Sequence, residues 1–172
     1  MFFGRKQKPE QPAEAVSSAG AEIAESAADA ALRDPLGLYH LWYLELRMQE
    51  ELVRAPRNSS FFSLATWRLR LLPGETPSTE LFAKAASLIS SKLRAYDIYA
   101  RIDETGIAAM LYDADYQAAS TVAFRINGDS QVGNASSGRW QAGVATYPAD
   151  GVDGDSLIHA AFCRLGEDAR AA

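Results

Sequence analysis

The stretch Leu93–Leu111, LRAYDIYARIDETGIAAML, decides the fold of this chain. From 98 to 102, small or branched apolar residues alternate with larger polar ones, which is the period of a strand with one buried face. Asp103–Gly106 supplies a turn, with Gly106 free to take a positive φ at its exit. Residues 107–112 then run back as an apolar strand. The stretch predicts the end of a helix followed by a β-hairpin.

Hydrophobic periodicity predicts the elements on either side of this hairpin. Leu38 to Leu52 carries apolar residues at helical spacing, with Asp34 as its cap and with Glu50 and Arg54 four residues apart as an ion pair. We expect further elements in this order: a strand at 61–72, a helix at 80–94, a helix at 113–127, a loop at 127–138, a strand at 139–148 and a helix at 156–165.

Length and composition bound the class of protein. The 172 residues suffice for one domain, and the hydrophobic share of 48% with 23% charged residues is that of a soluble globular protein. Residues 1–33 are poor in large apolar side chains and predict a disordered or partly helical tail before a domain at 34–172. The net charge of -5 argues against nucleic-acid binding, and no apolar run has the length of a membrane span.

The chain contains one cysteine, Cys163, so an internal disulfide is impossible and a reducing, cytoplasmic location is the expectation. We expect Cys163 to be a small buried residue of the last helix rather than a nucleophile. His159 is expected to be partly buried in the same helix. With His40 as the only other histidine, the sequence predicts no metal site and no cofactor.

Several segments resemble GGDEF domains, the fold of diguanylate cyclases. Arg101–Leu111 stands where such domains read RYGGDEFAVLL, but the turn here reads DETGI. The opening DPLGLYHLWYLELRMQEEL is similar to DPLTGLxNRRYFEERL, and GVATYPADG at Gly143–Gly151 is similar to a late strand and turn of the family. The resemblance implies an α/β (α+β) fold of the nucleotidyl-cyclase kind, with a central, mostly antiparallel sheet flanked by helices.

The same resemblance implies that catalysis has been lost. The two metal-binding aspartates of the family's first strand correspond to Arg68 and Arg70, and guanidinium groups cannot supply the oxygen ligands that Mg²⁺ requires. The family's guanine-reading segment NDxxGHxxGD has no counterpart between 71 and 79. The arginines are either two exposed side chains or partners of Asp103 and Glu104 in ion pairs that close the old site. The chain is therefore expected not to be an enzyme.

Arg94-Ala95-Tyr96-Asp97, nine residues before the turn, matches the family's RxxD inhibitory site, which binds cyclic di-GMP. A guanidinium can donate to guanine O6 and N7 or to phosphate, and a carboxylate can accept from guanine N1–H and N2–H₂. Arg125 stands where some members carry a second arginine that reaches the ligand from a neighbouring protomer. The alternatives are a surface ion pair for Arg94 and Asp97 and a solvated helix residue for Arg125.

These features predict a non-catalytic cyclic di-GMP receptor that signals through dimerisation or through a protein partner bound to the tail or to the domain surface. A structural or scaffolding module without ligand binding is the alternative.

Overall fold

The structure, a computed structural model, describes residues 30–129 and 138–165. By the contacts between its residues the chain divides after Leu32, and the elements below lie in the unit Arg33–Ala172. The predicted tail at 1–33 falls almost entirely outside the described residues, and so does the segment 130–137 of the predicted loop.

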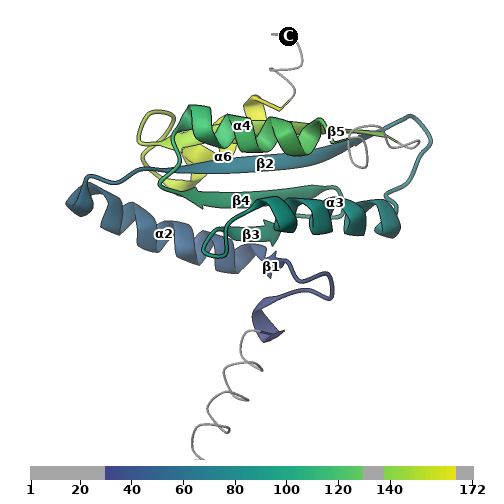
Figure 1. Cartoon of the computed structure of the whole chain (residues 1–172), viewed down its shortest axis with the longest axis horizontal. Helices are drawn as coiled ribbons and strands as arrows, with labels where there is room; N and C mark the ends of the chain where they lie inside the picture. Colours follow the sequence, from purple (N-terminus) through teal and green to yellow (C-terminus); the bar gives the residue numbers. More distant parts are fainter. Residues whose placement is uncertain (1–29, 130–137, 166–172) are drawn as a thin grey trace, which may run out of the picture. The chain divides into compact units, whose positions relative to one another are not determined.

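A five-stranded sheet forms the centre of the described part, in the order β1-β3-β4-β2-β5 (Figure 1). β1 pairs with β3 in parallel, and every other neighbouring pair is antiparallel. The predicted α+β class with a mostly antiparallel sheet is therefore confirmed. The strands are β1 (Tyr39–His40), β2 (Phe62–Leu71), β3 (Ile98–Arg101), β4 (Gly106–Tyr112) and β5 (Gly138–Tyr147).

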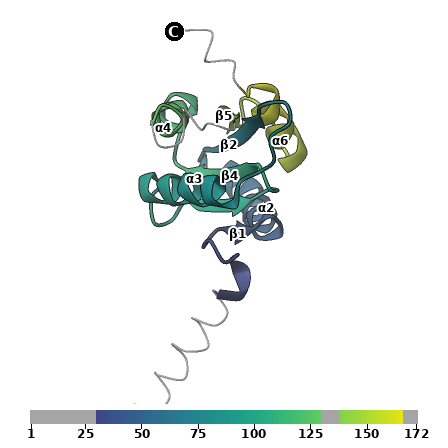
Figure 2. The same cartoon turned by 90° about the vertical axis from the view of Figure 1, so that its right-hand side faces the viewer.

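Helices cover both faces of the sheet. Figure 2 shows α3 and α4 on one side and α2 and α6 on the other. The sheet residues alternate accordingly: Trp67 and Ile107 belong to the core under α3 and α4, whereas Leu64 and Met110 belong to the core under α2 and α6. The helices are α2 (Leu41–Asn58), α3 (Thr79–Lys92), α4 (Tyr116–Asn127) and α6 (Gly154–Cys163).

The predicted hairpin is confirmed. β3 and β4 pair from Ile98 opposite Met110 to Arg101 opposite Ile107, and the Ile102 N–H donates to the Gly106 carbonyl at 2.9 Å. Gly106 does not use its freedom of φ, because the positive-φ glycines of the described residues are Gly37 and Gly74. Gly106 is instead the first residue of β4.

The predicted capping role of Asp34 is wrong. Its Oδ1 accepts from the N–H groups of Leu36 and Leu38, at 2.8 and 3.1 Å, and so closes a turn. The chain then forms β1 before α2 begins, so that His40 is the N-cap residue. Tertiary pairing of β1 with β3 thus displaces the start of the helix to Leu41.

The expected burial of Cys163 and His159 is also wrong. α6 buries Leu157 and Ala161, which lie four residues apart on its inner face. Cys163 and His159 follow them by two residues each, so both turn to the exposed side of the helix, where Sγ lies 3.6 Å from Nδ1. None of the helices in the described part of the chain combines the length and apolar character that crossing a bilayer requires.

Candidate functional site

The hairpin turn is held by its own side chains. Asp103 Oδ1 accepts from the Thr105 N–H at 2.8 Å and from its hydroxyl at 2.9 Å. Asp103 Oδ2 lies 2.5 Å from Arg68 Nη2, and the Arg68 guanidinium lies 5.3 Å from the ring centre of Phe162 on α6. Partial burial alone would raise the pKa of Asp103, but the bonds from Thr105 and Arg68 outweigh it and lower this pKa.

One half of the predicted ion-pair closure is confirmed and the other half is wrong. Arg68 pairs with Asp103, but Arg70 Nε donates to the side chain of Gln141 at 2.9 Å rather than to Glu104. The strand register explains this difference. β2 pairs with β4 only as far as Arg68 opposite Gly106, and beyond that point its remaining neighbour is β5.

The turn does not fit a bound Mg²⁺. The two β2 positions that the resemblance aligns with metal-binding aspartates are Arg68 and Arg70. The carboxylate of Asp103 is already engaged by Arg68 and Thr105. In residues 30–129 and 138–165 no group of three or more His, Cys, Asp or Glu side chains could hold a metal ion. The space next to Gly106 is also filled by the Arg68 side chain, because a Cβ at Gly106 would lie 3.3 Å from Arg68 Nη2.

The RxxD residues meet at the other end of the hairpin, where α3 passes into β3. Asp97 is 6% exposed, and its Oδ2 accepts from the Arg94 N–H at 2.9 Å. Its Oδ1 accepts from the Tyr112 N–H of β4 at 3.4 Å. Burial raises the pKa of Asp97, and the two backbone hydrogen bonds offset part of that rise. Asp97 thus ties the helix end to the sheet.

Arg94 presents a different face of the same corner. Its side chain is exposed, and Nη1 donates to the hydroxyl of Tyr96 at 2.9 Å. The guanidinium carbon lies 5.7 Å from the centre of the Tyr96 ring. The structure therefore brings Arg94 and Asp97 together through the Arg94 backbone, while the guanidinium stays at the surface beside Tyr96.

Arg125 is exposed in the last turn of α4 and does not join this corner within one chain. The carbonyl of Ala123, two residues earlier, accepts from Trp67 Nε1 at 3.3 Å. Trp67 pairs with Ile107 near the hairpin turn, whereas Asp97 is bonded to Tyr112 at the opposite end of β4.

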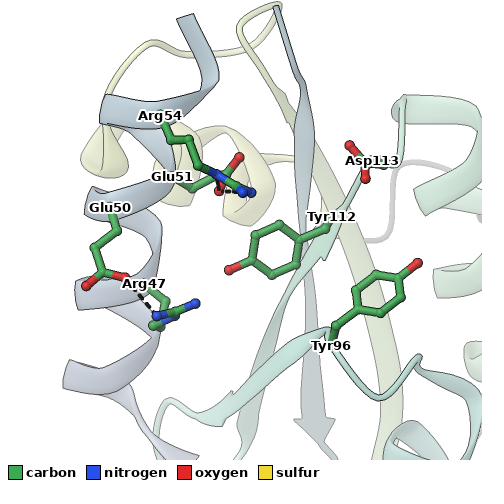
Figure 3. A pocket seen from close by; sticks show the side chains of 7 residues that line it. All are labelled: Arg47, Glu50, Glu51, Arg54, Tyr96, Tyr112 and Asp113. Atoms are coloured by element: carbon green, nitrogen blue, oxygen red, sulfur yellow. Dashed lines mark hydrogen bonds and ion pairs between the residues drawn. The ribbon is translucent and has the colours of Figure 1, made fainter. Parts of the chain in front are cut away.

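A groove of about 570 Å³ opens beside the RxxD corner, between α2 and the end of β4. Figure 3 shows side chains from α2 on one wall and the two tyrosines on the other. Sequence reasoning missed this groove, although Tyr96 lies inside the RxxD motif. The lining residues are Arg47, Glu50, Glu51, Arg54, Tyr96, Tyr112 and Asp113.

Charges in the groove are paired along α2. Arg54 Nη2 lies 2.6 Å from Glu51 Oε2, and the Glu51 side chain is 5% exposed. Arg47 Nη1 lies 2.8 Å from Glu50 Oε2, so the predicted pairing of Glu50 with Arg54 is wrong. Arg54 pairs with Glu51, three residues before it, rather than with Glu50, because burial holds the Glu51 side chain within reach of Arg54.

The far wall of the groove is aromatic. The rings of Tyr96 and Tyr112 meet edge to face with their centres 6.4 Å apart, and the Arg54 guanidinium carbon lies 6.0 Å from the Tyr112 ring centre. Burial raises the pKa of Tyr112, and the neighbouring Arg47 offsets part of that rise. A neutral phenol therefore faces the groove at physiological pH.

Neither protein-family models nor curated protein sequences match this chain. Solved GGDEF domains share its fold. SiaD, a diguanylate cyclase from Pseudomonas aeruginosa solved with its activator SiaC, is 20% identical with a TM-score of 0.71, and the match covers 92% of this chain and 66% of that one. This chain thus spans slightly less than two thirds of SiaD.

Two further GGDEF structures give the same result. The coiled coil and GGDEF domain of DgcB from Caulobacter crescentus, solved with c-di-GMP, is 15% identical with a TM-score of 0.69 over 92% of this chain and 91% of that one. The FimX GGDEF domain from Pseudomonas aeruginosa is 18% identical with a TM-score of 0.68 over 82% and 95%. At these identities the likeness establishes the fold.

Proposed function

We propose that this chain is a non-catalytic receptor for cyclic di-GMP, which it binds at the corner formed by Arg94 and Asp97. The observation that carries the proposal is the arrangement of that corner. An exposed guanidinium stands beside Tyr96, the turn beneath it is fixed by a buried carboxylate, and a groove opens next to both.

The state of the hairpin turn supports the non-catalytic part of the proposal. Joining two GTP molecules requires metal ions that neutralise the phosphates and a turn that lets backbone N–H groups approach them. Here Asp103 places a carboxylate at that turn and Arg68 binds it, so both the metal ligands and the open backbone are missing.

The chemistry of Arg94 supports ligand binding. Its guanidinium has donors beyond the one given to Tyr96, and these suit guanine O6 and N7 or a phosphate. Asp97 accepts one backbone N–H at each oxygen, which leaves a second lone pair on each for guanine N1–H and N2–H₂. Arg125 would contribute from a second protomer, because it lies at the other end of the sheet.

Signal output is proposed to pass through a homodimer or a protein partner. SiaD, which shares the fold, was solved in complex with an activator protein. In this chain the tail at 1–33 and the surface of the domain at 34–172 are the proposed contacts. We propose a cytoplasmic location, in keeping with a single cysteine and a diffusible ligand.

A second candidate function is a scaffolding module that binds no nucleotide. The burial of Asp97 favours it, since a 6% exposed carboxylate with two backbone donors already performs a structural task. In this alternative the RxxD motif serves only to connect the end of α3 to β4 through the hydrogen bonds of Asp97.

Calorimetric titration with cyclic di-GMP separates the two functions. The receptor predicts micromolar or tighter binding that Arg94→Ala abolishes, while Arg57→Ala, which removes an exposed arginine of α2, binds as the wild type does. Absence of binding to the wild type leaves the scaffold, whereas equal affinity in Arg94→Ala places the dinucleotide at another site and contradicts the proposed corner. If Arg125 contributes, Arg125→Ala lowers the affinity by a smaller factor and changes the stoichiometry.

A further inference from the structure

We propose that the groove between α2 and β4 holds one guanine base of the dinucleotide, stacked between Arg54 and Tyr112 with its donor edge on Asp113. This inference rests on the proposed function and extends the site beyond the RxxD motif. It assigns ligand contacts to Arg54 on one side and to Tyr112 and Asp113 on the other, which lie fifty-eight or more positions apart in the sequence.

Continuity with the RxxD corner is the first argument. Tyr96 lines the groove and accepts a hydrogen bond from Arg94, while Tyr112 lines it and donates its N–H to Asp97. A ligand held at the corner therefore has the groove as its immediate neighbour. The volume of about 570 Å³ falls in the range of about 300–1,000 Å³ typical of small-molecule sites.

The spacing of the two walls is the second argument. Bases in protein sites stack on aromatic rings and on guanidinium planes. Arg54 and Tyr112 face each other across 6.0 Å, and a planar base in contact with both needs about 7 Å, or two van der Waals contacts. The Arg54 side chain is 59% exposed and can move outward by this small amount.

Charge balance decides which part of the ligand enters. The lining residues comprise two arginines and three carboxylates, and each arginine is already paired with a glutamate. Such a groove disfavours phosphate groups and suits a neutral base. The phosphates then lie outside it, on the side of Arg94.

Asp113 gives the groove its preference for guanine. It is exposed, lines the groove and follows Tyr112 directly, with φ of 49°. Aspartate is among the few non-glycine residues that adopt this left-handed conformation readily. A carboxylate accepts from guanine N1–H and N2–H₂, whereas adenine presents no such donor pair.

Two substitutions test the groove while preserving the fold. Arg54→Lys keeps the positive charge beside buried Glu51 but removes the planar guanidinium, and Asp113→Asn keeps a residue that tolerates positive φ but replaces an acceptor oxygen by a donor. The matched controls are Arg57→Lys on the same helix and Glu104→Gln on the hairpin turn, both exposed and outside the lining of the groove. Circular dichroism and thermal melting verify that each variant is folded.

Calorimetric titration with cyclic di-GMP is expected to show about tenfold or greater loss of affinity in each groove variant and less than about twofold change in each control. Cyclic di-AMP, titrated in parallel, should gain on cyclic di-GMP in Asp113→Asn. If Arg94→Ala abolishes binding while both groove variants bind as the wild type does, the groove assignment fails and the receptor function stands. If the wild type does not bind cyclic di-GMP, both fail.

Discussion

Arg68 Nη2 lies 2.5 Å from Asp103 Oδ2, so a residue of β2 holds the turn between β3 and β4. The pair joins residues thirty-five positions apart, at the turn that the sequence resemblance aligns with the GGDEF motif. The Arg68 side chain is 32% exposed and also packs over Phe162. The ion pair therefore fixes the turn to the neighbouring strand β2.

Loss of this pair should destabilise the domain. We expect Arg68→Ala to lower the free energy of unfolding by about 1 kcal/mol or slightly more, because it removes an ion pair and a cation–π contact that are only partly solvent-exposed. Urea denaturation followed by circular dichroism measures the change. Arg70→Ala is the matched control and should cost less, because it removes an exposed side chain that donates to Gln141. Equal effects of the two substitutions would show that the Arg68–Asp103 ion pair does not stabilise the domain.

The lowered pKa of Asp103 predicts a specific dependence of stability on pH. A carboxyl with a lower pKa in the folded state stabilises the fold above its ordinary pKa of about 4, and this stabilisation is lost as the pH falls through the folded pKa. The stability difference between wild type and Asp103→Asn should therefore shrink as the pH falls from about 5 through the lowered folded pKa. Solvent exposure limits the whole difference to under about 1 kcal/mol. A difference that grows on acidification would contradict the assignment.

Asp97 should matter for stability even without ligand. Asp97→Ala leaves the N–H groups of Arg94 and Tyr112 without their acceptor in a buried corner, at a cost of about 1–3 kcal/mol. Arg94→Ala removes an exposed side chain and should change stability by less than about 0.5 kcal/mol. Thermal melting of both variants in the absence of nucleotide makes the comparison. A stable Asp97→Ala variant would show that the carboxylate does not tie α3 to β4.

The raised pKa of Asp97 acts in the opposite direction to that of Asp103. Its folded form holds the proton more tightly than the unfolded chain does, so this group contributes stability as the pH falls through its folded pKa and loses it as the pH rises. Asp97→Asn, which stays neutral and keeps one acceptor, should therefore compare best with the wild type at high pH and worst at low pH. A comparison that runs the other way would place the charged form in a favourable environment.

Incubation with GTP and Mg²⁺ should yield no cyclic di-GMP. The guanidinium of Arg68 occupies the carboxylate that a metal would need, and Arg70 stands at the second aligned position. Chromatography of the nucleotides after prolonged incubation detects the product. Any cyclic di-GMP whose formation is lost in Asp103→Asn would contradict the non-catalytic assignment.

The hairpin could be predicted from the sequence because its information is local. The alternation from Ile98 onward, the polar turn and the apolar return strand specify two paired strands without reference to the rest of the chain. The pairing of Arg68 with Asp103 was predicted from the resemblance to GGDEF domains, which sets β2 beside the hairpin turn. The predicted pairing of Arg70 with Glu104 was wrong because β4 begins at Gly106, opposite Arg68. This strand register is not fixed by hydrophobic periodicity.

The groove could not be predicted for the same physical reason. Arg54 and Tyr112 come from elements separated in the chain by one helix and two strands, and only the packing of α2 against the sheet brings them within 6.0 Å. Spacing on the helix suggested Glu50 as the partner of Arg54, but burial of Glu51 decided otherwise. Asp113 gave one local signal, its position after an apolar strand, and no pattern in the sequence indicated its positive φ.

The most direct test of the receptor is a crystal structure of this chain grown or soaked with cyclic di-GMP. Binding at the corner predicts electron density for the dinucleotide there, with the Arg94 guanidinium within hydrogen-bond distance of a guanine or phosphate oxygen. Density that lies only at the Asp103 turn, or no density beside Arg94 and Asp97 at saturating dinucleotide, would contradict it.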